Sequence, residues 1–362
     1  MTRRARILAR HAALLPLLSL TACSPLYVLR TGYEEARILW RREPIQRILA
    51  APGLDEATRA QLQLALAVRA FARDHLGLRV GGSYNTYARV DPDQVVHVVA
   101  AAPRLRLEPY TWWFPIVGRV PYKGFFSAAA AAREAEALER RGLDTLVRRS
   151  VAFSTLGWFD DPLLSSQVAL DRVALTEVIL HELLHSTVYL AGHAEFDESF
   201  ATFVGHQGAI EFFAAARDHE GTRRAAATWQ DALAFSDFLG RFAARLRAAY
   251  AGGADLARRA ALFAEGQAEF RRAGLQAGTY RRFADEQLNN AVVLQYLAYT
   301  DRLPLFAQLH QHEGGDLART IARVRALARE HADDPFAAID AAARSPLESA
   351  RALPEGAGTH TP

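Results

Sequence analysis

The chain has 362 residues, half of them apolar, which is enough to bury a core in one large domain or in two. Four of the 43 Lys and Arg residues, and none of the 40 Asp and Glu residues, lie in the first 22 positions, so the rest of the chain is close to neutral. A nucleic-acid partner would need a basic patch and is therefore not expected. The single cysteine, Cys23, rules out a disulfide within the chain.

The N-terminus has the pattern of a secretory signal peptide over residues 1–22. Four arginines open it, and an apolar stretch follows at residues 12–20. The sequence LTAC at residues 20–23 resembles the bacterial lipobox, which predicts that Cys23 is the lipidated first residue of the mature protein. Since Ser24 rather than Asp follows the cysteine, we expect a membrane-anchored lipoprotein of the bacterial outer membrane that faces the periplasm. No transmembrane span is predicted beyond this signal.

After the signal, the pattern is first helical and then typical of strands and turns. An N-terminal helical segment is expected over residues 23–80, with Asp55 as the N-cap of one of its helices. Strand and turn signals dominate from there, beginning with a β-rich run at residues 94–99. Two aromatic stretches, residues 111–118 and 120–126, either pack under a loop or line a substrate cleft.

The most informative stretch is VILHELLHSTVY at residues 178–189. Residues four apart lie on one face of a helix, so His181 and His185 can bring two imidazole nitrogens to one point, with Glu182 beside it. This is the H-E-x-x-H pattern, in which two histidines hold a zinc ion and the glutamate polarises a water. The surrounding positions are apolar nearly all round, which predicts a buried helix whose polar side chains need partners.

A third ligand separates a zinc site from a chance occurrence of the motif. Gly192 offers a stop to the first helix, and Asp197 is predicted to cap a second apolar helix that begins with Glu198. Glu198 would then return to the metal and complete a site of two histidines and one glutamate for one zinc ion, with the fourth position left for water. Other divalent ions also accept this ligand set.

The expected fold is mainly α, within the α+β class, with the two zinc helices beside a small β-sheet and flanked by helical lobes. We expect a catalytic core over residues 81–215 and a C-terminal helical lobe over residues 216–345. The polar, Gly- and Pro-rich tail at residues 346–362 is predicted to be disordered. No internal repeat is found.

A set of linked motifs resembles the bacterial family of predicted zinc aminopeptidase lipoproteins, relatives of the gluzincin metallopeptidases. In chain order they are TWxFP at residues 111–115, PYKGFF at 121–126, STLGWF at 154–159, HELLH at 181–185 and FDESFAT at 196–202. The resemblance implies a gluzincin-like fold and a peptidase activity. It also implies that His181, His185 and Glu198 are the metal ligands and that Glu182 is the general base.

Two further roles follow from the same resemblance. A strand predicted at residues 146–153 leads into a segment that would hold an extended peptide through backbone hydrogen bonds, namely Ser154, Thr155, Leu156, Gly157 and Trp158. Tyr299 is the first candidate, and Tyr296 the second, for a phenol that stabilises an oxyanion; their other interpretation is helix packing.

Three positions depart from the family pattern. Ser186, Asp197 and Gly205 stand where Gln, Asn and Glu are usual. A glutamate one or two turns beyond the third ligand often supports a metal histidine, and His206 is the candidate that would replace it.

The leading hypothesis is a zinc-dependent peptidase, most simply an aminopeptidase, that acts on peptides in the periplasm with Glu182 as general base. An aminopeptidase also needs an acidic group for the free amine of its substrate, and Asp160, Asp161 and Glu195 are candidates. The alternative is a lipid-anchored binding or envelope-assembly protein that keeps the zinc fold without turnover. A zinc hydrolase with another substrate class also remains open.

Overall fold

The computed structural model describes residues 37–90, 96–114, 118–149 and 160–345. The first part contains two short strands, a short helix and one long helix. In chain order the elements are β1 (Glu43–Pro44), α3 (Ile45–Ala50), α4 (Glu56–Asp74) and β2 (Thr86–Ala88). The carboxylate of Asp55 accepts a 2.8 Å hydrogen bond from the backbone N–H of Thr58, which confirms the predicted N-cap. A small sheet in the order β1-β2-β8 joins this part to β8 (Leu163–Leu164).

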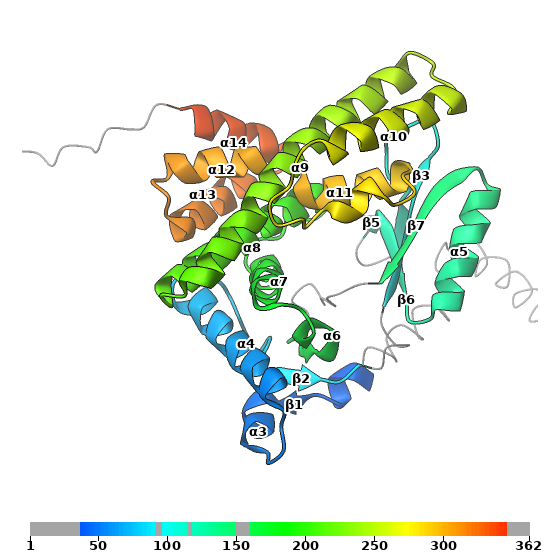
Figure 1. The fold of residues 1–362 in the computed structure, drawn as a ribbon. Coiled ribbons are helices and arrows are strands. Elements are labelled where there is room, and N and C mark those ends of the chain that lie inside the picture. Colours follow the sequence, from blue (N-terminus) through cyan, green and yellow to red (C-terminus); the bar gives the residue numbers. More distant parts are fainter. Residues whose placement is uncertain (1–36, 91–95, 115–117, 150–159, 346–362) are drawn as a thin grey trace, which may run out of the picture.

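A second sheet has the order β6-β3-β7, with β3 (His97–Pro103) antiparallel to both β6 (Tyr122–Phe125) and β7 (Leu143–Arg149). Two helices, α5 (Ala128–Arg140) and α11 (Asn290–Thr300), cover its opposite faces (Figure 1). Ala131, Ala135 and Leu138 of α5 pack on one face of this sheet, where Val99 and Ala101 of β3 meet them. A separate ribbon pairs β4 (Trp112–Phe114) with β5 (Gly118–Val120).

The helices that carry the HELLH and FDESFAT motifs lie at the centre of the molecule. They are α7 (Arg172–His185), preceded by the short α6 (Ser165–Val168), and α8 (Ala194–Ala215). Asp171 caps α7 by accepting hydrogen bonds from the N–H groups of Val173 and Ala174. Both helices are buried on nearly every side, and they share one apolar core with α4 and with helices near the C-terminus.

The C-terminal half is helical. It contains α9 (His219–Ala251), α10 (Leu256–Arg271), η2 (Arg281–Ala284), α11, α12 (Leu303–His312), α13 (Leu317–Glu330) and α14 (Pro335–Arg344). The long α9 extends across the molecule to pair with α10 (Figure 1). The predicted class, mainly α with a small sheet beside the central helices, is therefore confirmed. None of the helices in the described part combines the length and apolarity of a membrane-spanning segment.

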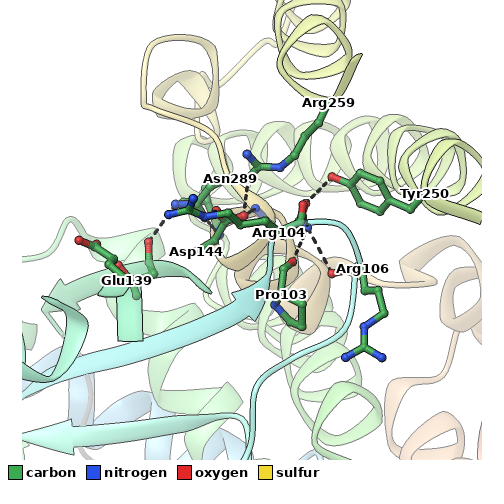
Figure 2. Close-up of polar contacts among 11 residues, drawn as sticks. Pro103, Arg104, Arg106, Glu139, Asp144, Tyr250, Arg259 and Asn289 are labelled. Carbon is green, nitrogen blue, oxygen red and sulfur yellow. Dashed lines mark hydrogen bonds and ion pairs between the residues drawn. The ribbon is translucent and has the colours of Figure 1, made fainter. Parts of the chain in front are cut away.

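A buried polar cluster fixes the start of α11 to the second sheet (Figure 2). The side chain of Asn290 is completely buried, and its Nδ2 donates to the carbonyls of Pro103, Arg104 and Arg106 at 2.8–3.2 Å. Asp144 of β7 accepts from the backbone N–H of Asn290 at 3.0 Å and forms an ion pair with Arg259 of α10. The cluster therefore ties sheet, α10 and α11 together, and α11 carries Tyr299 at its other end.

Candidate metal centre

Three side chains from α7 and α8 meet at one point. His181 Nε2 lies 3.1 Å from Glu198 Oε2 and 3.2 Å from His185 Nε2, and His185 Nε2 lies 3.8 Å from the same carboxylate oxygen. These ligand atoms all lie within 4.8 Å of one another. Within the described residues, no other group of His, Cys, Asp and Glu side chains converges in this way.

The separations between the ligand atoms fit a metal ion. Zinc bonds of about 2.0–2.2 Å at tetrahedral angles put neighbouring ligand atoms about 3.3–3.6 Å apart. The three observed separations, 3.1, 3.2 and 3.8 Å, lie around this range. Because the described residues add no fourth His, Cys, Asp or Glu to the group, a tetrahedral ion here would keep one position for water.

The start of α8 differs from the prediction. The helix begins at Ala194, so Asp197 lies inside its first turn and is not its N-cap, and Glu198 does not open it. Asp197 Oδ1 instead accepts a 2.9 Å hydrogen bond from the backbone N–H of Leu190, in the loop that precedes the helix. This bond folds the loop back onto the helix, which can then begin earlier than a capping Asp197 would allow. Glu198 still faces the two histidines because the buried Phe196 and Phe200 fix the rotation of α8.

The electrostatics of the three side chains are strongly coupled. Burial by itself would raise the pKa of Glu198, but the hydrogen bonds from His181 and His185 hold it well below its usual range. Burial would likewise lower the pKa of His185, but the hydrogen bond and charge of Glu198 raise it to about 9. Without a cation, a proton shared between carboxylate and imidazole therefore takes the place that a metal would occupy.

A second polar group lies one turn before His181 on α7. The Glu177 carboxylate accepts a 2.7 Å hydrogen bond from the Thr228 hydroxyl, and the same oxygen lies 2.9 Å from His206 Nδ1. A Cβ atom added at Gly205 would come within 2.8 Å of the Glu177 carbonyl oxygen, so α8 packs directly on the α7 backbone there. A glutamate at position 205 does not fit this packing, and His206 joins α8 to Glu177.

Tyr299 of α11 lines the metal centre. Its ring stacks on that of His181, with 6.0 Å between the ring centroids. Burial, followed by the charge of Glu198, raises the pKa of its phenol, so the group is neutral and can donate a proton in a hydrogen bond. Tyr296, the second candidate, points elsewhere: its hydroxyl donates to Glu286, and its ring packs in the aromatic core around Phe235.

Glu182 lies within electrostatic reach of phenols from three separate parts of the chain. Its negative charge contributes to the raised pKa values of Tyr84, Tyr122 and Tyr299, after burial in each case. Tyr122 belongs to β6, and 40% of its surface is exposed. Burial and then the charge of Glu198 raise its pKa, so it lies within electrostatic reach of the centre. Tyr84 is buried with a left-handed φ of 61°, a conformation that is uncommon outside glycine.

The two aromatic stretches were expected either to pack under a loop or to line a substrate cleft, and one residue fits each interpretation. Trp112 packs in the core under the second sheet, whereas Tyr122 lies toward the metal centre. Sequence reasoning did not single out Tyr122. The only available signal was alternation along β6, which required the sheet register to be known.

The acidic candidates for binding a substrate amine lie in two places, the turn before β2 and the first turn of α8. Asp160 accepts a 2.6 Å hydrogen bond from the backbone N–H of Gly82, and the Asp161 carbonyl accepts from the N–H of Tyr84 at 2.8 Å. Both residues thus shape the turn before β2. Glu195 lies in the first turn of α8, where burial and the charge of Asp301 raise its pKa.

Besides the predicted signal peptide at residues 1–22 and the predicted tail at residues 346–362, two predicted site features fall outside the described residues. These are the lipidation residue, Cys23, and the substrate strand of Ser154, Thr155, Leu156, Gly157 and Trp158. The described part of β7 ends at Arg149, shortly before that segment.

The sequence of the chain matches the family model described as "Putative aminopeptidase" over residues 26–338. This match spans most of the chain and includes the metal centre, so the protein belongs to that aminopeptidase family. No curated protein and no solved structure matches the chain.

Proposed function

We propose that the protein is a zinc-dependent aminopeptidase with a gluzincin-like centre. The observation that carries this proposal is the convergence of His181, His185 and Glu198 on one point, with Glu182 on the turn between the histidines. Membership of an aminopeptidase family supplies the substrate class, which is peptides.

Each of these residues has a separate role in the proposed hydrolysis. A zinc ion held by His181, His185 and Glu198 supplies a Lewis acid that makes water more acidic. Glu182 accepts the proton of the attacking water and passes it to the leaving amine. Tyr299 donates a hydrogen bond to the oxygen of the scissile carbonyl as negative charge develops on it.

The proposed location follows from the N-terminus. The signal at residues 1–22 and the cysteine at position 23 support a lipoprotein anchored in the outer membrane and facing the periplasm. The alternative function, a lipid-anchored zinc-fold binding protein without turnover, is less well supported. A purely structural zinc site is closed by four protein ligands, whereas three converge here among the described residues.

The test uses one purified soluble form that begins at Ser24. Zinc content is measured on the same sample as hydrolysis of aminoacyl substrates and of N-terminally blocked, internally quenched peptides. One equivalent of zinc with release of N-terminal residues supports the proposal, and cleavage of blocked peptides alone makes the protein an endopeptidase. Glu182→Gln should keep the metal and lose turnover at least about a hundredfold. Zinc binding without any turnover would favour the binding protein.

A further inference from the structure

Arg148, near the end of β7, occupies an unusual position for a cation. Side chains alternate along a strand, so Asp144, Leu146 and Arg148 all face α11. Asp144 holds the start of that helix, and Arg148 Nη2 donates a 3.2 Å hydrogen bond to the Tyr299 hydroxyl near its end. The spacing agrees, because four residues of strand and nine of helix both span about 13–14 Å.

The guanidinium of Arg148 has no counter-charge at ion-pair distance in the part of the chain that the structure describes. No carboxylate of the described residues lies within 4.0 Å of it, whereas Arg259 on the same side of the sheet is paired with Asp144. Its Nε is buried without a hydrogen-bond partner in the described part of the chain. A buried donor on a charged group is costly when unpaired, and the neutral Tyr299 phenol balances no charge.

Tyr299 connects Arg148 to the metal centre. Its guanidinium carbon lies 5.6 Å from the centre of the Tyr299 ring, which is 6.0 Å from the His181 ring. These separations limit the distance from Arg148 to the His181 ring to about 12 Å, the span of three or four extended residues. A divalent ion would balance the charges of Glu182 and Glu198, so the charge of Arg148 would remain uncompensated.

We propose that Arg148 binds the free C-terminal carboxylate of a short peptide, which makes di-, tri- and tetrapeptides the preferred substrates. This inference rests on the proposed peptidase function and adds the substrate class to it. A guanidinium recognises a carboxylate through paired N–H donors, and the unpaired Nε is one of the donors such a pair uses. The peptide extends from the scissile bond at the metal centre past Tyr299 to Arg148.

Three matched peptides test the proposal: trialanine with a free C-terminus, trialanine amide, and an alanine peptide amide with aspartate as its last residue. The wild-type kcat/KM should be about ten to a hundred times higher for the free acid than for the amide. Arg148→Met should abolish that preference and leave the amide rate within a few-fold. Arg148→Lys, which keeps the charge but not the planar pair of donors, should retain part of it.

Two controls separate recognition of the carboxylate from positioning of Tyr299. Arg149→Met removes the neighbouring arginine, which is exposed on the opposite face of β7, and should change neither rate. Tyr299→Phe should slow all three peptides alike and keep their ratio. An equal loss of rate for all three peptides in Arg148→Met would show that Arg148 only positions Tyr299, and would overturn the proposal.

Calorimetric binding of the same peptides to zinc-loaded Glu182→Gln, with and without Arg148→Met, keeps the two proposals separate. Preferential binding of the free acid that disappears with Arg148 supports the inference even if no peptide is hydrolysed by the wild type. Turnover without any preference for the free acid would overturn the inference and leave the peptidase intact. A preference for the aspartate amide equal to that for the free acid would assign the carboxylate to a side chain and overturn the C-terminal assignment.

Discussion

His185 and Glu198 can bind either a proton or a metal ion. Their mutual hydrogen bonding raises the pKa of His185 to about 9 and holds the pKa of Glu198 well below its usual range. A metal ion needs the imidazole in its neutral form, so protons compete with metal for this site. The competition gives the metal-free protein a pH dependence that the loaded protein lacks.

We predict that the metal-free protein loses stability as the pH rises from about 6.5 to about 9. A pKa that folding raises contributes stability that is complete below the unfolded value, near 6.5, and is lost as the pH passes the folded value, about 9 for His185. Urea unfolding at a series of pH values measures this. The zinc-loaded protein is the control, because its histidines are neutral when bound; the same decline in both forms would contradict the prediction.

Among the secondary-structure elements, the crossing of α7 and α8 decides the geometry of the site. Two ligands come from α7 and one from α8, so the distance between the helices sets the distance between the ligands. Gly205 allows the close approach, because any Cβ there would press on the Glu177 carbonyl. The Glu177 side chain in turn forms hydrogen bonds with His206 of α8 and Thr228 of α9, which hold the crossing in place.

We predict that Gly205→Ala destabilises the protein and weakens zinc binding. The clash costs about 1–3 kcal/mol, against at most about 1 kcal/mol gained from the better helix propensity of alanine. Gly240→Ala in α9 is the matched control: a Cβ there meets nothing within 4 Å, so the propensity gain should appear alone. Urea unfolding and competition for zinc with a chelator measure the two effects. Unchanged zinc affinity in Gly205→Ala would contradict the role of the crossing.

We also predict that Asn290→Ala costs about 2–3 kcal/mol in the free energy of unfolding. The variant removes three hydrogen bonds, which Asn290 donates to the partly buried carbonyls of Pro103, Arg104 and Arg106 beside the start of α11. Tyr250→Phe removes the bond that the Tyr250 hydroxyl donates to Asn290 but keeps the three bonds to the carbonyls, and should cost about 1 kcal/mol. Equal costs for the two variants, measured by urea unfolding, would show that the carbonyl bonds contribute little.

For the whole molecule, the arrangement around one apolar core separates folding from metal binding. The core that surrounds α7 and α8 also includes α4, α12, α13 and α14, so the helices have support on several sides. The second sheet brings Tyr122 and Arg148 toward the same centre, and α11 adds Tyr299. A metal ion bound here would therefore be an addition to a folded scaffold, unlike the ion of a zinc finger.

We predict that chelation of the metal abolishes hydrolysis but leaves the helical circular dichroism signal intact. The free energy of unfolding should fall by about 4 kcal/mol relative to protein in free zinc a thousandfold above its dissociation constant. Restoring zinc should restore activity. Loss of the helical signal on chelation would show that the two central helices depend on the metal to fold.

The sequence by itself determined the local part of the site. The spacing of His181 and His185 is a property of any α-helix, and the apolar surroundings of both helices predicted their burial. The three side chains that could hold a metal ion and the mainly α class could therefore be predicted directly from the sequence. The start of α8 was mispredicted because the bond from Leu190 to Asp197 depends on how the loop folds back.

Tertiary structure alone decided which distant residues share the centre. Tyr122 and Arg148 reach it through the register of a sheet, and Tyr299 through a helix fastened to that sheet about 150 residues away along the chain. No local period encodes such meetings, since they depend on how faces far apart in sequence pack together. The same packing placed Arg148 against Tyr299, with no carboxylate partner among the described residues, which is the basis for its proposed role.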